Sequence, residues 1–440
     1  MAPIAAFAPS GSLPLGGPAF RHSSIRAPLG GSLGAGLAGG RTVRAATSHS
    51  ALSTRMAASE GEGAPLLSQW GTRRAALFSI LASTLLMGGS PGGAATDEAT
   101  QAAAGTLSSR VMQVVPTSVP EQPYGLTEAS AGGESALIKS FAELDALFLG
   151  EHHNSFADHA LQAEIIQTLH KETKTTGKKV EVGLEMVQKQ FQPVLDAYIS
   201  RANKDDKQAE KELYDGVRWA ERWFWSYEAY LPVFRSCREL GIPLVALNVD
   251  SETLTKVSAG GLDALSQAEK DAYVSDKKGF VSFIKTPGYS QYVNEVVMES
   301  FALHVRMGLL GNSPKASNFF ASRILWDEGM SNVAWGRIKK DPKTLMVVLE
   351  GADHVKYRKG SVGRLERMDP SLKVKSVMLN PSSADTSPSG TMGDTLALSL
   401  SYPEKGTEKA GSLPLADYVW WSEPPAGSIV AASVPILARK

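Results

Sequence analysis

Three of the eight histidines in this 440-residue chain lie within residues 152–159, directly behind an acidic residue. A histidine far downstream repeats the same spacing of glycine, two residues, histidine. Histidine and carboxylate side chains bind metal ions and transfer protons near neutral pH. The two Gly-x-x-His groups therefore predict acid–base or metal chemistry. Their members are Gly150, Glu151, His152 and His153 in the first group, and Gly351, Asp353 and His354 in the second.

Each group stands at the end of a short apolar run, and long stretches with helical periodicity separate such runs. Near-continuous apolar runs are typical of strands covered on both faces. Strands that alternate with helices predict a mostly parallel sheet, whose ligands bind at the carboxyl ends of the strands. Glu185 ends another run, so we expect it near both histidine groups. The expected strands are 146–150, 179–186, 242–250, 344–351 and 373–380, with an edge strand at 396–402 and a last strand at 417–421.

The start of one helix can be placed to the residue. Ser155 and Asp158 form a capping-box-like pair, so a helix should begin at Phe156. Two longer stretches, 187–237 and 252–340, contain more helix than crossovers between parallel strands require. The sequence therefore predicts an α/β fold: a mostly parallel sheet flanked by helices, with an inserted helical subdomain.

We expect this domain to cover residues 136–421. Residues 97–135 are rich in Ala, Gly, Ser and Pro, which predicts a flexible lead-in, and residues 422–440 form a tail. The net charge is zero, which predicts no nucleic-acid partner. Cys237 is the only cysteine, which excludes an intramolecular disulfide and a CxxC site. The sequence leaves the oligomeric state open, with a homodimer as one alternative.

Residues 1–96 carry two targeting signals rather than a fold. No acidic residue precedes Glu60, and arginine, serine and alanine are frequent, as in organelle transit peptides. The twin arginine at 73–74 then precedes an apolar run over 75–87 and a small-residue cleavage motif at 93–95. This order resembles the leader of thylakoid-lumen proteins, so we expect chloroplast import and delivery to the thylakoid lumen. A short membrane anchor is the alternative for the apolar run, and the mature chain should have no transmembrane segment.

Several longer stretches, in this order along the chain, resemble one family. They are GEHHNSFADHALQ (150–162), GLEMVQKQFQPVLDAYI (183–199), RWFWSYEAYLPVFRSCRELGIPLVALNVD (222–250), WDEGM (326–330) and EGADHVKYRKGSVGRLER (350–367). The resemblance is to the ChaN family, the haem-binding-uptake group of the Tiki/TraB superfamily, which also includes erythromycin esterases. It covers about residues 140–421 and implies a parallel α/β fold with a helical insertion and haem binding.

The resemblance also implies a site. In hydrolytic relatives the paired Gly-x-x-His motifs and a nearby glutamate form a metal or catalytic site. The corresponding residues here are Gly150, Glu151, His153, Glu185, Gly351 and His354. The bacterial haem protein carries a lipid-anchoring cysteine after its signal, whereas Cys237 lies deep in the domain here.

The first functional hypothesis is a soluble binder of haem or another tetrapyrrole, held by the strand ends and the helical insertion. Haem iron takes an axial histidine or tyrosine. Tyr292 and His304 are twelve residues apart, so in a continuous α-helix they would lie near one face. The aromatic run from Trp219 to Phe234 is expected to be core rather than cofactor wall. The candidates for contact with the cofactor are His153, His354, His304, Tyr289, Tyr292 and Tyr357.

The alternative is a metal-dependent hydrolase, a protease or an esterase. A divalent metal ion would be held by Glu151, His153, Glu185 and His354, and Glu151 or Glu185 would be the catalytic base. Neither GxSxG nor HExxH occurs in residues 97–440, so the usual serine-hydrolase and zincin routes are not supported. A scaffold without chemistry is the third hypothesis. In it, Glu151 would stabilise a helix N-terminus, His153 would be a core histidine, and His159 would be a surface residue as readily as a ligand.

Overall fold

The computed structural model describes residues 108–118, 123–129, 133–200, 205–310, 313–381, 385, 396–399 and 411–423. The predicted leader, residues 1–96 with the twin arginine and the cleavage motif, lies outside the described residues, and so does most of the predicted tail. None of the described helices has both the length and the hydropathy needed to cross a membrane.

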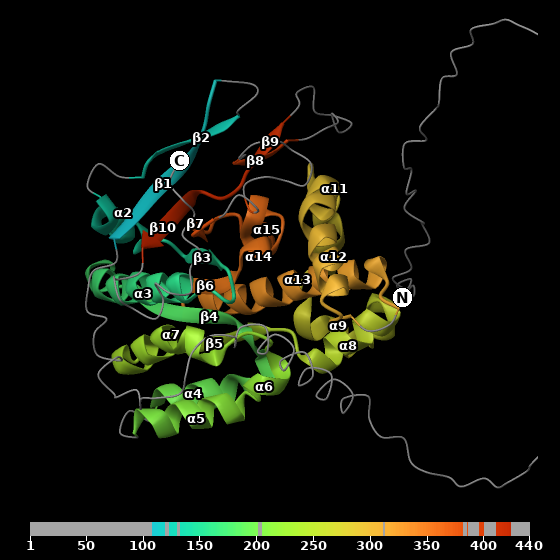
Figure 1. Ribbon diagram of the computed structural model, residues 1–440, viewed down its shortest axis with the longest axis horizontal. Coiled ribbons are helices and arrows are strands. Elements are labelled where there is room, and N and C mark those ends of the chain that lie inside the picture. Colours follow the sequence, from blue (N-terminus) through green and yellow to red (C-terminus); the bar gives the residue numbers. More distant parts are fainter. Residues whose placement is uncertain are drawn as a thin grey trace, which may run out of the picture. The chain divides into compact units, whose positions relative to one another are not determined.

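A single eight-stranded sheet forms the centre of the domain (Figure 1). The five predicted central strands are present as β3 (Ala146–Glu151), β4 (Lys179–Gln188), β5 (Leu244–Asn248), β6 (Thr344–Gly351) and β7 (Val374–Leu379). The predicted last strand is β10 (Tyr418–Glu423). The spatial order β10-β7-β3-β6-β4-β5 is parallel throughout, which confirms the mostly parallel α/β sheet.

Two further strands extend the sheet where the sequence predicted a flexible lead-in. β1 (Ser108–Pro116) pairs antiparallel with β10, and β2 (Tyr124–Glu128) pairs antiparallel with β1. The expectation for residues 97–135 therefore misses both strands, and the sheet extends past both limits of the expected 136–421 domain. Composition could not indicate them, because β1 is stabilised by a partner from the opposite end of the chain.

The predicted edge strand at 396–402 does not join the main sheet. Instead β8 (Ala397–Ser399) pairs antiparallel with β9 (Ser412–Pro414) in a separate two-stranded sheet. The Tyr124 hydroxyl donates to the Ser412 carbonyl oxygen at 3.4 Å and so connects β2 to this small sheet.

Alternating residues of the central strands face two separate hydrophobic cores. Leu147 and Leu149 of β3 lie in one core, and Phe148 lies in the other. The first core is closed by α2 (Gly133–Phe141), α3 (Phe156–Thr176) and α7 (Tyr227–Leu240). The second is closed mainly by α13 (Ala316–Lys340) and α15 (Ser361–Met368). Both faces are covered, and β3, β5 and β6 are accordingly almost wholly apolar up to their carboxyl ends.

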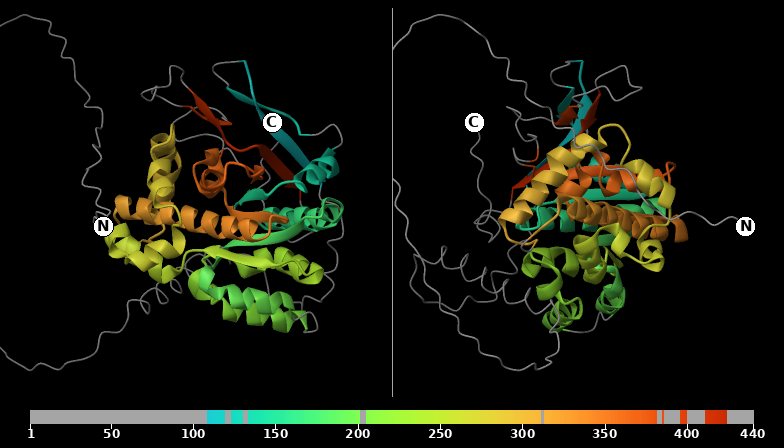
Figure 2. Two further views of the ribbon diagram at one scale, coloured as in Figure 1. Left: turned by 180° about the vertical axis from the view of Figure 1, so that it is seen from behind. Right: turned by 90° about the vertical axis from the view of Figure 1, so that its right-hand side faces the viewer.

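The predicted helical insertion consists of two groups of helices. Between β4 and β5 lie a short 3₁₀ turn (Lys189–Phe191), α4 (Gln192–Ser200), α5 (Asp206–Gly216), α6 (Trp219–Arg222) and α7. Between β5 and β6 lie α8 (Ser251–Gly260), a 3₁₀ turn (Leu262–Ala264), α9 (Gln267–Tyr273), α10 (Lys277–Phe283), α11 (Tyr289–Tyr292), a π-helical turn (Val293–Val297), α12 (Met298–Arg306) and α13. Figure 2 shows the green helices α4 and α5 apart from the yellow α11 and α12, which stand beside the orange α13.

Helix α3 begins where the sequence predicts. Ser155 is its N-cap, and the Ser155 hydroxyl oxygen accepts a hydrogen bond from the Asp158 N–H at 3.1 Å. The helix ends at Gly177, whose φ of 74° is the left-handed conformation that glycine adopts at little cost. This fixed start determines how the chain leaves β3 and where the residues after Glu151 lie.

Candidate ligand site at the strand ends

The carboxyl ends of β3, β6 and β4 lie side by side in the sheet and bring the predicted residues together (Figure 1). Glu151 ends β3 opposite Gly351, the last residue of β6. Glu185 of β4 accepts a hydrogen bond from the Gly351 N–H at 2.6 Å. Two histidines that follow β3 and β6 complete a strand-end cluster, which consists of Glu151, His153, Glu185 and His354.

Glu151 is the buried centre of the first half of the cluster. Its Oε1 lies 3.0 Å from Nδ1 of His153 and accepts a hydrogen bond from the Tyr230 hydroxyl at 2.6 Å. Its Oε2 accepts from the Gln162 amide at 2.7 Å. Burial alone would raise the pKa of Glu151, but His159 and His153 hold it well below its ordinary value. The carboxylate is therefore ionised, fully partnered and fixed in position.

The second half is a buried chain of carboxylate, imidazole and carboxylate. His354 Nε2 lies 3.2 Å from Glu185 Oε1, and His354 Nδ1 hydrogen-bonds to Asp327 of α13. Burial and Arg323 lower the pKa of His354, but Glu185 and Asp327 outweigh them and raise it to about 10. His354 is therefore an imidazolium at neutral pH, with both ring nitrogens in use.

His153 is the accessible member of the cluster. Burial lowers its pKa, but Glu185 and Glu151 raise it above the ordinary value. Its side chain is 20% exposed, whereas that of His354 is 5% exposed. A ligand that reaches the strand-end cluster would therefore meet the His153 ring first.

The glycines of the two Gly-x-x-His motifs have a packing role. A Cβ on Gly351 would lie 2.8 Å from Nε2 of His153, so any side chain there would displace the imidazole. A Cβ on Gly150 would meet Val355 at 3.1 Å and Met378 at 3.2 Å. The second motif thus lets the histidine of the first lie directly against the end of β6.

Aromatic rings from the helical insertion surround the two histidines. The His153 ring centroid is 5.0 Å from that of Trp223 and 5.8 Å from that of Trp225. The His354 ring is 5.6 Å from Trp326. The sequence predicts the aromatic run 219–234 to be core, and Trp219 and Trp223 are buried in the first hydrophobic core, against which the partly buried Trp225 packs.

His152 and Asp353 do not join the cluster. His152 Nδ1 lies 2.9 Å from Asp158, and its Nε2 lies 3.0 Å from Asp385. Burial lowers the pKa of His152, but the two aspartates raise it to about 10. Asp353 pairs with Lys356 at 2.8 Å, and Lys356 also reaches Asp385 at 3.1 Å. These motif residues form an ion-pair network of their own.

His159 is neither a surface residue nor an exposed ligand. It is fully buried behind Glu151, with Nε2 3.4 Å from Glu151 Oε1, and its Nδ1 hydrogen-bonds to the Ser155 carbonyl oxygen. His159 therefore supports the charge of Glu151 from the protein side of the cluster.

The three tyrosine candidates are buried in the second hydrophobic core. Tyr292 is completely buried and donates to the Asp353 carbonyl oxygen at 3.0 Å, and burial raises its pKa well above the ordinary value. Tyr289 accepts from Arg364 at 3.2 Å. Burial also raises the pKa of Tyr357, to about 12. Burial thus opposes ionisation of all three hydroxyls.

His304 lies on α12 in a different setting. The π-helical turn Val293–Val297 separates it from Tyr292, so their twelve-residue spacing does not place them on one α-helical face. Nδ1 of His304 lies 2.7 Å from the Ser300 carbonyl oxygen, and the ring is 5.4 Å from Phe319. Burial lowers the pKa of His304. The imidazole is therefore neutral at pH 7, with its proton on Nδ1 and its Nε2 lone pair available.

The residues predicted as metal ligands pair with one another instead. Glu151 with His153, and Glu185 with His354, form histidine–carboxylate contacts. Across the described residues, no group of three or more His, Cys, Asp or Glu side chains is arranged to hold a metal ion. What the arrangement offers is two fixed histidine–carboxylate pairs and, on α12, one neutral imidazole.

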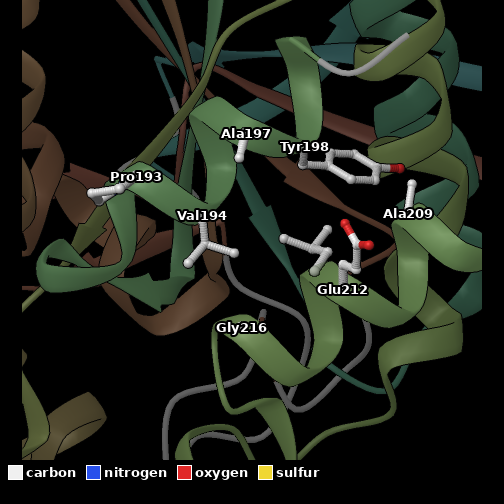
Figure 3. A pocket seen from close by; sticks show the side chains of 8 residues that line it. Pro193, Val194, Ala197, Tyr198, Ala209, Glu212 and Gly216 are labelled. Atoms are coloured by element: carbon white, nitrogen blue, oxygen red, sulfur yellow. The ribbon is translucent and has the colours of Figure 1, made fainter. Parts of the chain in front are cut away.

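A pocket of about 370 Å³ lies between α4 and α5 (Figure 3). Its lining is mostly apolar and shares no residue with the strand-end cluster. The lining residues are Pro193, Val194, Ala197, Tyr198, Ala209, Glu212, Leu213 and Gly216. The convergent polar groups that usually orient a ligand are found at the strand ends, not here.

One family model matches residues 137–365, and its description is "Haem-binding uptake, Tiki superfamily, ChaN". A curated relative, the Arabidopsis thaliana protein RETICULATA-RELATED 5, chloroplastic, is 25% identical over 273 residues. The match covers 60% of this chain and 32% of the relative, so the chain spans about a third of that relative's length.

Two solved structures are similar to part of this chain. ChaN of Campylobacter jejuni, described with cofacial haem, is 15% identical and has a TM-score of 0.43, with 71% of this chain and 97% of that chain covered. A mutant of the erythromycin esterase EreC in its open conformation is 13% identical and has a TM-score of 0.34, with 66% of this chain and 94% of that chain covered.

Proposed function

Because the chain belongs to the ChaN haem-binding-uptake family of the Tiki superfamily, we propose that it binds haem or a closely related tetrapyrrole. The ligand would lie between the strand-end cluster and the inner face of α12. The observation that carries this proposal is the charge state and hydrogen bonding of His304. It is a neutral imidazole whose Nδ1 bonds to a backbone carbonyl, which is the arrangement that most metal-ligating histidines adopt.

The other histidine candidates are less suited to bind iron. A ligating imidazole must be unprotonated at the binding nitrogen. The pKa of His354 is raised to about 10, and that of His153 is raised as well, because both rings lie beside carboxylates. His304 requires no such deprotonation, so His304 would bind the iron and His153 would be a second polar contact.

The surroundings of His304 fit a large, flat, apolar ligand. Phe319 stands beside both His304 and Phe301, with ring centroids 5.4 Å and 5.3 Å apart. On the same helix Leu303 is 47% exposed and Val305 is 41% exposed, among the few large apolar side chains that face solvent in the described part of the chain. Exposed apolar surface next to a candidate ligand position is typical of binding sites. When bound, haem would supply an iron centre, and this chain would supply the imidazole and the apolar walls.

An absorbance titration with haem tests the proposal. The full chain should give a saturable, shifted Soret band, and His304→Ala should lose it or shift it to the position of weakly held haem. His170→Ala is the matched control, because His170 lies on α3 away from the cluster, and it should titrate like the wild type. A wild-type spectrum identical to that of free haem would refute the proposal.

A hydrolase remains the second candidate because of one observation. His153 is accessible, hydrogen-bonded to the ionised Glu151, and backed by the buried pair of Glu185 and His354. A positioned imidazole with a carboxylate partner can transfer protons in ester or amide hydrolysis. Glu151→Gln should abolish any such hydrolysis, whereas haem binding through His304 should survive that change.

The location of the protein is also a proposal. The relative from Arabidopsis thaliana is called chloroplastic, which supports plastid import of this chain. The order of signals in residues 1–96 further suggests the thylakoid lumen, with a mature chain that starts near residue 97. A reporter fused to residues 1–96 should accumulate in the lumen, and its retention in the stroma or cytosol would refute this route.

A further inference from the structure

Arg323 of α13 is a buried guanidinium whose donors are largely unused. The residue is 8% exposed, and both Nε and Nη2 are buried without a hydrogen-bond partner among the described residues. Its one ion-pair contact in the described chain is to Asp327, with Nε 3.4 Å from Asp327 Oδ1. Buried donors without partners are rare in folded proteins because each carries an uncompensated desolvation cost. A buried guanidinium with unpaired N–H donors is suited to bind an anionic hydrogen-bond acceptor.

Asp327 alone cannot satisfy Arg323. A guanidinium carries five N–H donors, and a carboxylate can take two of them in a bidentate pair. Asp327 Oδ1 also accepts from His354. Even an ideal pair between Arg323 and Asp327 would leave three donors of Arg323 free.

Another buried arginine of this core differs in this respect. Arg364 donates from Nη1 to Glu328 at 2.7 Å and from Nη2 to the Tyr289 hydroxyl at 3.2 Å. Its guanidinium also lies 5.4 Å and 5.0 Å from the ring centroids of Phe280 and Phe283. Arg364 therefore has partners for both Nη atoms and leaves only Nε without one, whereas Arg323 leaves Nε and Nη2 without a hydrogen-bond partner among the described residues.

Arg323 also has the right location. Its positive charge helps to lower the pKa of His304 and opposes the rise in the pKa of His354. It likewise helps to hold the pKa of Asp353 down.

Contacts along α13 give the same position: Arg323 lies one helical turn after Phe319, whose ring centroid is 5.4 Å from that of His304. Its Nε lies 3.4 Å from Asp327, which hydrogen-bonds to His354. The guanidinium therefore lies between α12 and the strand-end cluster, where the proposed ligand would be bound.

We propose that Arg323 is the anion subsite of this ligand site and binds an ionised carboxylate of the ligand through Nε and Nη2. The inference rests on the proposed function and narrows the ligand class to tetrapyrroles with free carboxylate side chains. It adds a residue that determines specificity, because an esterified or carboxylate-free tetrapyrrole leaves the Arg323 donors unpaired. Rejection of such analogues is large when a buried polar group of the site loses its partner.

Two ligands and two variants test this inference in the full chain. The ligands are haem and haem dimethyl ester, whose carboxylates are blocked. We expect wild type to bind haem about tenfold more tightly than the diester, as the loss of a charge-assisted hydrogen bond predicts. Arg323→Gln should bind both equally. Arg337→Gln is the matched control on the same helix, because Arg337 pairs with Glu181 at 2.7 Å, and it should keep the tenfold preference.

The outcomes separate the two proposals. Equal binding of haem and diester by wild type, or a preference that persists in Arg323→Gln, overturns the anion subsite and leaves haem binding intact. Absence of binding for both ligands overturns haem binding and the subsite together. If Arg323→Gln does not fold, Arg323→Lys keeps a positive charge beside Asp327 but loses the two-nitrogen fork. Its preference should fall to about threefold, and an undiminished preference would overturn the inference.

Discussion

The two histidine environments of this site differ in charge although the side chain is the same. His354, at the end of β6, lies between Glu185 and Asp327, and its pKa is raised to about 10. His304, on α12, faces a backbone carbonyl, and burial lowers its pKa. Carboxylate neighbours therefore keep His354 an imidazolium at neutral pH, whereas His304, beside a carbonyl oxygen, is a neutral base. The first suits fixed charge or proton donation, and the second suits a metal ligand.

The largest effect, on the free energy of unfolding, should come from removing the carboxylate partner of the buried His354. Asp327→Ala would leave the His354 imidazolium without its closest partner, and removal of one member of a buried ion pair costs about 3–5 kcal/mol. Urea denaturation monitored by circular dichroism would measure the loss in unfolding free energy. Asp341→Ala removes an exposed partner of Lys179 and should change little. Equal stability of the two variants would contradict a charged His354.

The pH dependence of stability should separate the same two histidines. The pKa of His354 is raised from 6.5 to about 10 on folding, so its contribution to stability is complete below pH 6.5 and is lost as pH rises through 10. His354→Gln should therefore flatten part of the fall in stability over this window. His152 shares the window, with a pKa of about 10, so some slope should remain.

The matched variant is His304→Gln, because the pKa of His304 moves in the opposite direction. It should leave the alkaline slope unchanged. Urea melts at intervals from pH 6 to pH 10 would measure both variants, and an unchanged slope in His354→Gln would contradict the assigned charge.

A smaller effect, on haem affinity, should come from removing the aromatic side chain beside His304. Phe319 lies 5.4 Å from the His304 ring and would pack against a flat ligand. An aromatic contact of this kind contributes about 0.5–1.5 kcal/mol, so Phe319→Ala should weaken haem binding by about three- to tenfold. Phe224→Ala is the control, because Phe224 contacts Trp225 rather than α12. Equal haem affinities of wild type and Phe319→Ala would place the ligand elsewhere.

The sequence predicted the parallel sheet and the convergence at its carboxyl ends because both follow from local patterns. The apolar runs end in Glu151 and Gly351, and adjacent parallel strands bring their ends together. Ser155 placed the start of α3 for the same reason, since a helix cap is a local signal.

Other parts of the site could not be predicted from local patterns. Asp327 and Tyr230 reach the histidines from the helices α13 and α7, and Trp223 does so from the segment after α6. All three are distant in sequence from the histidines, and no local pattern indicates these contacts. The pairing of β1 with β10 has the same character. The spacing of Tyr292 and His304 misled because a π-helical turn lies between them. The sequence grouped His152 with His153, but in the structure the His152 ring contacts Asp158 and Asp385 instead of the strand-end cluster.

The most direct test of the account is one haem titration run on His304→Ala and His153→Ala in parallel, with absorbance and resonance Raman spectra of the saturated proteins. The account predicts that His304→Ala loses the histidine–iron signature and binds haem more weakly by at least the roughly 10–100-fold that even an outer-shell change costs a metal site. His153→Ala should keep that signature and bind with only a modest loss. The reverse result, with the iron ligand lost in His153→Ala and retained in His304→Ala, would contradict the central claim and place the iron at the strand ends.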